Sequence, residues 1–123
     1  MKPNRNTAMM LLSALSLLPL PAAYVLHMNA REYGAFADLF APDAVVHDEG
    51  HEHHGPAAIR AWIEEAHQKY QPMFEPNSYK EEDSGCVCVI TGMVSGNFDG
   101  SPIELKHRLT ILDGKIVGLR ITV

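Results

Sequence analysis

The stretch that decides the fold spans residues 40–63 and reads FAPDAVVHDEGHEHHGPAAIRAWI. Pro42 disfavours helical geometry at the residue before it, so a preceding helix is expected to end here. The β-branched residues within 44–46 then predict a short strand. Side chains alternate along a strand, so Asp48 is predicted to share the apolar face of this strand. The stretch therefore places a carboxylate on the buried side of the sheet.

The second half of the same stretch predicts a helix that packs over the end of the strand. Gly55 and Pro56 interrupt the chain, and proline suits the first turn of a helix. The segment that follows, AAIRAWIEEAHQKY, ends at Tyr70. Its apolar residues recur at helical spacing, at Ile59, Trp62, Ile63 and Ala66.

Two short helices are expected before the strand, and four further strands after the last helix. The apolar faces of the first two helices are Tyr24, Val25 and Met28, then Tyr33, Phe36, Ala37 and Phe40. Prolines 72 and 76 are expected to end the last helix, and strands are predicted at residues 78–82, 86–95, 103–112 and 116–123. Helices followed by antiparallel strands predict an α+β fold, with the sheet wrapped over the helices. Such a bent sheet leaves a concave apolar pocket for a small ligand.

The composition limits the classes of partner. The chain has 123 residues and a net charge of −5, which fits one domain with a single core. Nucleic-acid binding relies on clustered Lys and Arg, and no basic patch is evident in the sequence, so no nucleic-acid partner is expected. Cys86 and Cys88 would point to one face of a strand, and we predict two buried thiols rather than a disulfide or a metal site.

The first residues form a separate segment in this interpretation. Residues 1–19 are assigned to an N-terminal extension and residues 20–123 to the domain. The extension has a basic start, an apolar run over residues 8–18 and small residues after it, which is the outline of a secretory signal. The run is shorter than the about 20 apolar residues of a membrane span. A segment that the fold does not need is the alternative, so cytoplasmic and exported locations both stay open.

Several short motifs carry a family resemblance over about residues 20–123. They are Tyr24-Val25, Asn29-Ala30, Leu39-Phe40-Ala41, Asp43-Ala44, Val46, Asp48, Gly55 and Ala57-Ala58-Ile59-Arg60. In these motifs the chain resembles the nuclear transport factor 2-like superfamily, in its SnoaL-like and ketosteroid-isomerase-like branch. The resemblance implies a cone of three N-terminal helices packed in a strongly curved, mainly antiparallel sheet. Members include isomerases, cyclases, hydrolases and binding modules, so activity must be argued from the site.

The same resemblance implies three site residues and no cofactor. Tyr24 stands where ketosteroid isomerases keep their oxyanion-hole tyrosine, and Asp48 where they keep the aspartate that moves the proton. His107 falls at the place of a protonated aspartate, which is a departure from the isomerase pattern. Removal of a proton next to a carbonyl needs a base and a donor aimed at the oxygen, both shielded from water. Asp48, Tyr24 and His107 could supply these roles.

Structural roles are the alternative for the same residues. Asp48 could cap a turn or pair with Arg60, Tyr24 could be a core residue, and His107 could be a half-buried polar residue of a strand. His27, three residues after Tyr24 on the first helix, could line the rim of the expected pocket, and no role is assigned to it. The histidine-rich run, His47, His51, His53 and His54 with Asp48, Glu49 and Glu52, could hold a metal, or it could be the solvated edge of a hairpin.

The sequence is therefore compatible with three functions. The first is an acid–base enzyme, isomerase-like or cyclase-like, that acts on an apolar carbonyl or related substrate. The second is a non-catalytic binding or dimerisation module of the same fold, and the third is a metal-dependent site at the histidine run. A homodimer is also expected, because the outer strand face of Val87, Val89, Thr91 and Met93 needs a cover.

Overall fold

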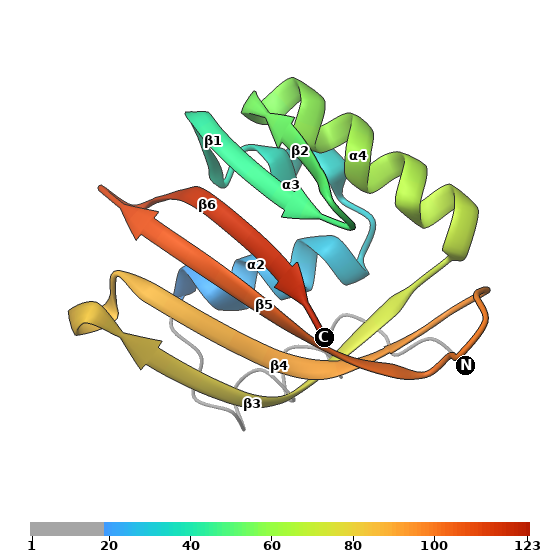
Figure 1. Cartoon of the computed structure of the whole chain (residues 1–123). Helices are drawn as coiled ribbons and strands as arrows, with labels where there is room; N and C mark the ends of the chain where they lie inside the picture. The colour runs from blue at the N-terminus through green and yellow to red at the C-terminus, as the bar shows by residue number, and fades with distance from the viewer. Residues whose placement is uncertain (1–18) are drawn as a thin grey trace.

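The computed structural model describes residues 19–123, so the expected N-terminal extension lies outside the described residues except for Pro19. The elements, labelled as in Figure 1, are α2 (Pro19–Asn29), α3 (Tyr33–Ala37), β1 (Phe40–Asp48), β2 (His51–His54), α4 (Gly55–Tyr70), β3 (Met73–Glu82), the 3-10 turn η1 (Asp83–Gly85), β4 (Val87–Ser95), β5 (Ile103–Leu112) and β6 (Lys115–Thr122). Three helices therefore precede most of the sheet, which confirms the predicted α+β fold. No helix within residues 19–123 is long and apolar enough to cross a membrane.

The strands form one sheet in the order β2-β1-β6-β5-β4-β3. All neighbours pair antiparallel except β1 and β6, which run parallel. The strands fan out from β1 to β3 in a strong curve, with α2 inside the curve and α4 beside β1 and β2 (Figure 1). The helices thus fill the concave side of the sheet, as the resemblance implied.

The starts of β1 and β3 differ most from the predicted boundaries, and proline explains both. The second helix also ends earlier than predicted, at Ala37, so Phe40 belongs to β1 and not to the face of that helix. β1 begins at Phe40, not near residue 44, and Pro42 lies where the pairing with β6 is interrupted between Phe40 and Val45. β3 begins at Met73 rather than Ser78, and its register with β4 shifts just after Pro76. Proline removes a ladder donor but is tolerated at edges and bulges, so these prolines bend strands instead of excluding them.

The bend in β3 also depends on a glycine of β4. A Cβ atom at Gly92 would overlap the carbonyl oxygen of Glu75 and would lie 2.8 Å from both the Phe74 ring and the Cα atom of Pro76. Only a residue without a side chain lets β3 approach so closely. Gly92 therefore permits the curvature that encloses the concave side.

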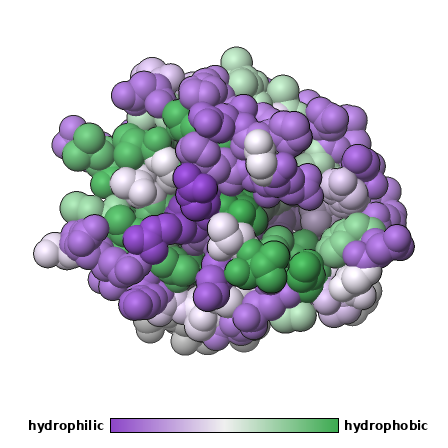
Figure 2. Space-filling view, viewed as in Figure 1, coloured by the Kyte–Doolittle hydropathy of each residue, from purple (hydrophilic) through white to green (hydrophobic). Residues whose placement is uncertain are grey.

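The core lies between the helices and the concave face of the sheet. Its largest fully buried side chains include Tyr24, Phe36, Ile59, Ile90, Leu109, Ile116 and Leu119. The prediction of two buried thiols is half right. Cys88 is buried, but Cys86 is exposed because it precedes β4 in the turn after η1. On the face turned to the viewer in Figure 2, hydrophilic residues surround separate hydrophobic patches.

Candidate active site

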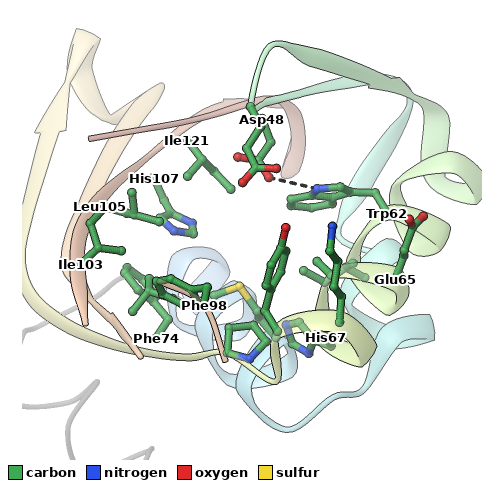
Figure 3. Close-up of a pocket in the computed structure, with 18 of the residues that line it drawn as sticks. Asp48, Trp62, Glu65, His67, Phe74, Phe98, Ile103, Leu105, His107 and Ile121 are labelled. Carbon is green, nitrogen blue, oxygen red and sulfur yellow. Dashed lines mark hydrogen bonds between the residues drawn. The ribbon is translucent and has the colours of Figure 1, made fainter. Parts of the chain in front are cut away.

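A cavity of about 700 Å³ opens between α4 and the concave face of the sheet. Its apolar wall includes Phe74, Val94, Phe98, Ile103, Leu105 and Ile121. Asp48, at the end of β1, and Trp62, from α4, lie on one side of this wall, and His107 of β5 faces the cavity from another (Figure 3). A mostly apolar hollow with a few polar groups pointing into it is the usual form of a small-molecule site.

His107 is fixed by two contacts that leave one ring nitrogen available. Its Nδ1 atom lies 2.6 Å from the hydroxyl oxygen of Tyr24, and its ring stacks on Phe74 with the centroids 4.3 Å apart. The Nε2 atom is buried and has no hydrogen-bond partner among residues 19–123. A buried polar atom without a partner is costly, so its presence on a cavity wall suits contact with a ligand.

Burial keeps the imidazole of His107 and the phenol of Tyr24 uncharged. It lowers the pKa of His107 from 6.5 to about 3, because the imidazolium would be desolvated. It also raises the pKa of Tyr24 well above its usual value, and the charge of Asp48 adds to that effect. When Tyr24 donates its proton to Nδ1, the neutral imidazole of His107 carries a hydrogen on Nε2 and can donate it into the cavity.

Asp48 is partly buried, and its carboxyl is held by α4. The indole Nε1 atom of Trp62 donates a hydrogen bond to Oδ2 of Asp48 at 3.2 Å, drawn as the dashed line in Figure 3. Burial raises the pKa of Asp48, while the hydrogen bond from Trp62 works in the opposite direction. Arg60, considered from the sequence as a structural partner, pairs instead with Glu64 at 3.0 Å. The carboxyl of Asp48 thus faces the cavity, and the alternative in which Arg60 pairs with it does not apply.

The structure brings two of the three predicted site residues to the cavity and places the third directly behind one of them. Asp48 and His107 line the cavity, whereas Tyr24 is fully buried behind His107 and touches it through its hydroxyl. The geometry thus gives Tyr24 the position of a support for His107. The catalytic roles of all three residues stay predictions.

Two residues of the site were missed by sequence reasoning. Trp62 was interpreted only as part of the apolar helix face, although an indole N–H commonly finds a partner when it is partly buried. Its position on the helix that packs over the strand end was the signal that could have linked it to Asp48. Phe74 was missed because the strand was predicted to begin only at residue 78, after the two prolines that were expected to end the helix.

The histidine-rich run forms a hairpin edge. β2 pairs with β1, His53 stacks on Trp62 with the centroids 5.7 Å apart, and His54 lies 3.2 Å from Glu52. No group of three or more His, Cys, Asp or Glu side chains in the described part of the chain is arranged to hold a metal ion. His27 contacts Glu32 at 2.9 Å, between α2 and α3.

Comparisons with known proteins agree on the fold. The family model described as "SnoaL-like domain" matches residues 22–119. A structure from Sinorhizobium meliloti, named as a candidate polyketide cyclase, is 34% identical with a TM-score of 0.84, over 89% of this chain and 98% of that one. No curated protein matches the chain significantly.

More distant structures share the fold alone. A candidate polyketide cyclase from Pseudomonas putida is 20% identical, with a TM-score of 0.75 over 85% of this chain and 88% of that one. A protein from Catenulispora acidiphila with a ketosteroid isomerase-like fold, solved with trimethylamine, is 16% identical with a TM-score of 0.75, over 85% of each chain.

Proposed function

The chain belongs to the SnoaL-like domain family, and on this premise we propose that it is an acid–base enzyme that removes a proton next to a carbonyl group of an apolar substrate. One observation carries the proposal. A carboxyl with a raised pKa, Asp48, and a neutral imidazole with an available Nε2 atom, His107, line the same largely apolar cavity. A base and a donor that are both shielded from water are what enolate formation requires.

The reaction begins at the carbon next to the carbonyl. The carboxylate of Asp48 takes the proton, and the electrons of the broken C–H bond form the enolate. The enolate oxygen accepts a hydrogen bond from Nε2–H of His107, whose ring is held by Tyr24. Where the enolate is conjugated with a carbon–carbon double bond of the substrate, Asp48 then returns the proton to the far carbon of that double bond, and the shifted double bond gives an isomer. If the enolate carbon first attacks a second carbonyl of the same molecule, Asp48 returns the proton to the new alkoxide, which gives a ring.

Ring closure is the outcome that we favour. The Sinorhizobium meliloti relative, at 34% identity, is named as a candidate polyketide cyclase. A substrate with several carbonyl groups on an apolar carbon skeleton would also suit a wall built from side chains such as Phe74, Leu105 and Ile121. Its rings would be buried against these side chains, and one carbonyl would reach His107.

The proposal can be tested without the natural substrate. Exchange of the α-protons of a small cyclic diketone for deuterium in D₂O, followed by NMR, reports proton removal directly. Trp62 is the single tryptophan of the chain and lines the cavity, so its fluorescence reports binding of the same compound. We expect Asp48→Asn to slow the enzyme-dependent exchange by about 10²- to 10⁴-fold while binding is largely kept.

The matched control is Glu65→Gln, which removes an exposed carboxylate from the rim of the same cavity. It should leave exchange unchanged. Equal exchange by wild type and Asp48→Asn would contradict the role of Asp48. Binding of the ketone by wild type with no exchange above the buffer rate would favour the binding module.

We also propose that two copies pair through the outer face of the sheet at β4. Val89, Thr91 and Met93 are only partly buried there, while Val87 is 7% exposed. Partly apolar strand faces of this kind mark association sites. Sedimentation at micromolar concentration should give twice the monomer mass, and a species of only 13.6 kDa would contradict the dimer.

A further inference from the structure

Three basic residues stand side by side on the outer face of the sheet. Arg120 of β6 is opposite Arg108 of β5 on one side and His47 of β1 on the other. Neighbouring strands lie about 4.8 Å apart, so their side chains are close together. Like charges directly opposite each other destabilise a sheet. Arg108 and Arg120 therefore place two positive charges directly opposite each other in a chain of net charge −5, and an anion bound between them would relieve their repulsion.

A hollow lies beside these residues. It measures about 280 Å³, and its lining includes His47, Arg108, Thr110, Gly118 and Arg120. Gly118 is opposite Thr110 in the register and contributes no side chain, which leaves room in the surface between β1 and β5. The hydroxyl of Thr110 adds a neutral donor at the edge. We call this group of five residues the basic hollow.

The arginines of the basic hollow keep donors available. Arg120 is exposed, and no ion pair holds it among the residues that the structure describes. Arg108 uses Nη1 to contact Glu82 at 2.7 Å, with the two side chains 47% and 31% exposed. A guanidinium has five N–H donors, and a surface pair of this kind contributes little stability. Arg108 can therefore contact a second anion.

We propose that the basic hollow binds the phosphoryl group of a small phosphorylated molecule. Two guanidinium groups that flank one hollow suit the tetrahedral oxygens of phosphate, because each can make two parallel hydrogen bonds. The site lies on the opposite face of the sheet from the cavity of Asp48 and His107. It is independent of the acid–base reaction and would hold a ligand that the cavity does not contact.

The test is a titration of the ¹⁵N-labelled protein with inorganic phosphate at constant ionic strength. The amides of Gly118 and Thr110 should shift with saturation, and Arg120→Gln or Arg108→Gln should weaken the apparent affinity at least tenfold. The control is Lys106→Gln, which removes an exposed cation on the same face of β5 that does not line the hollow. This variant should change the apparent affinity for phosphate by less than twofold. It alters the net charge by the same amount.

A second variant tests the shape of the hollow rather than its charge. A Cβ atom at Gly118 would lie 3.7 Å from the side chain of Thr110, which is an ordinary contact, so Gly118→Ala should fold normally. It should still weaken phosphate binding, because the space is reduced. The proposal is overturned if phosphate shifts these amides equally in wild type and Arg120→Gln, or does not shift them at all. It is also overturned if Arg120→Gln changes the sedimenting mass and phosphate has no effect, since the basic hollow itself would then lie in the contact between two copies.

Discussion

The two faces of the sheet give neighbouring residues opposite chemistry. On β5, His107 points to the concave side and is 4% exposed, whereas the next residue, Arg108, is exposed on the outer side. On β1, Asp48 lines the cavity, whereas His47 lines the basic hollow. On the concave face, burial moves the pKa of Asp48 and that of His107 toward the neutral form of each side chain. The outer face keeps its charges in water. Strand alternation alone therefore separates a largely buried side from a solvated charged side, one residue apart.

The largest effect should come from a comparison of two strand glycines. Gly92→Ala forces a methyl group against the backbone of β3, so we expect a loss of about 3 kcal/mol or more in the free energy of unfolding. Gly118→Ala, where the new atom meets only the side chain of Thr110, should change it by less than about 1 kcal/mol. Urea unfolding of both variants measures the difference. Similar losses in both would show that the concave face is no more tightly packed than the outer one.

The next largest effect is the loss of stability at low pH. The pKa of His107 is about 3 in the fold and 6.5 in a model peptide, so below pH 6.5 the unfolded chain binds a proton that the fold excludes. The free energy of unfolding should therefore fall as the pH drops from 6.5 toward 3, by about 1.4 kcal/mol per unit for this group. His107→Gln cannot take up this proton.

We expect wild type to lose about 2.5 kcal/mol more than His107→Gln between pH 6 and pH 4. Urea unfolding at the two pH values measures this difference, and other groups largely cancel in it. The comparison uses only the change in the free energy of unfolding between the two pH values. A variant that is less stable at both pH values, because its contact with Tyr24 is weaker, therefore still gives a clear result. Parallel pH profiles for the two proteins would mean that His107 takes up its proton in the folded state.

The smallest effect should come from loss of the hydrogen bond that Trp62 donates to Asp48. Trp62→Phe removes the indole donor while an aromatic ring is kept, and the hydrogen bond is one of the contacts that lower the pKa of Asp48. The pKa of this carboxyl should therefore rise further, and stability should fall by about 1 kcal/mol. NMR titration of the carboxyl carbon of Asp48 measures the shift. An unchanged or lower pKa would indicate that Trp62 does not hold the carboxylate in solution.

Short-range patterns predicted much of the fold and part of the site. Alternation along residues 44–48 placed Asp48 on the buried face, and helical spacing predicted α4 to within a residue. The contact of Tyr24 with His107 joins residues 83 positions apart, and only the resemblance to a known family suggested that they belong together. Such a contact depends on how far the sheet curves. The curvature comes from Gly92 and the bulge after Pro76, and the spacing of apolar residues along the sequence does not predict it.

The parallel pairing of β1 and β6 has a consequence for the order of assembly. β6 is the last strand in sequence, yet it lies between β1 and β5 near the middle of the sheet. The β1–β2 hairpin and the β3–β4–β5 meander therefore remain two separate pieces, each with an open edge, until β6 joins them. Contacts between such distant segments form slowly, and open edges invite wrong pairing in the meantime. During synthesis on a ribosome, the cavity could close only after Thr122 has emerged, so the dry environment of Asp48 and His107 forms only when every other strand of this sheet has already been made.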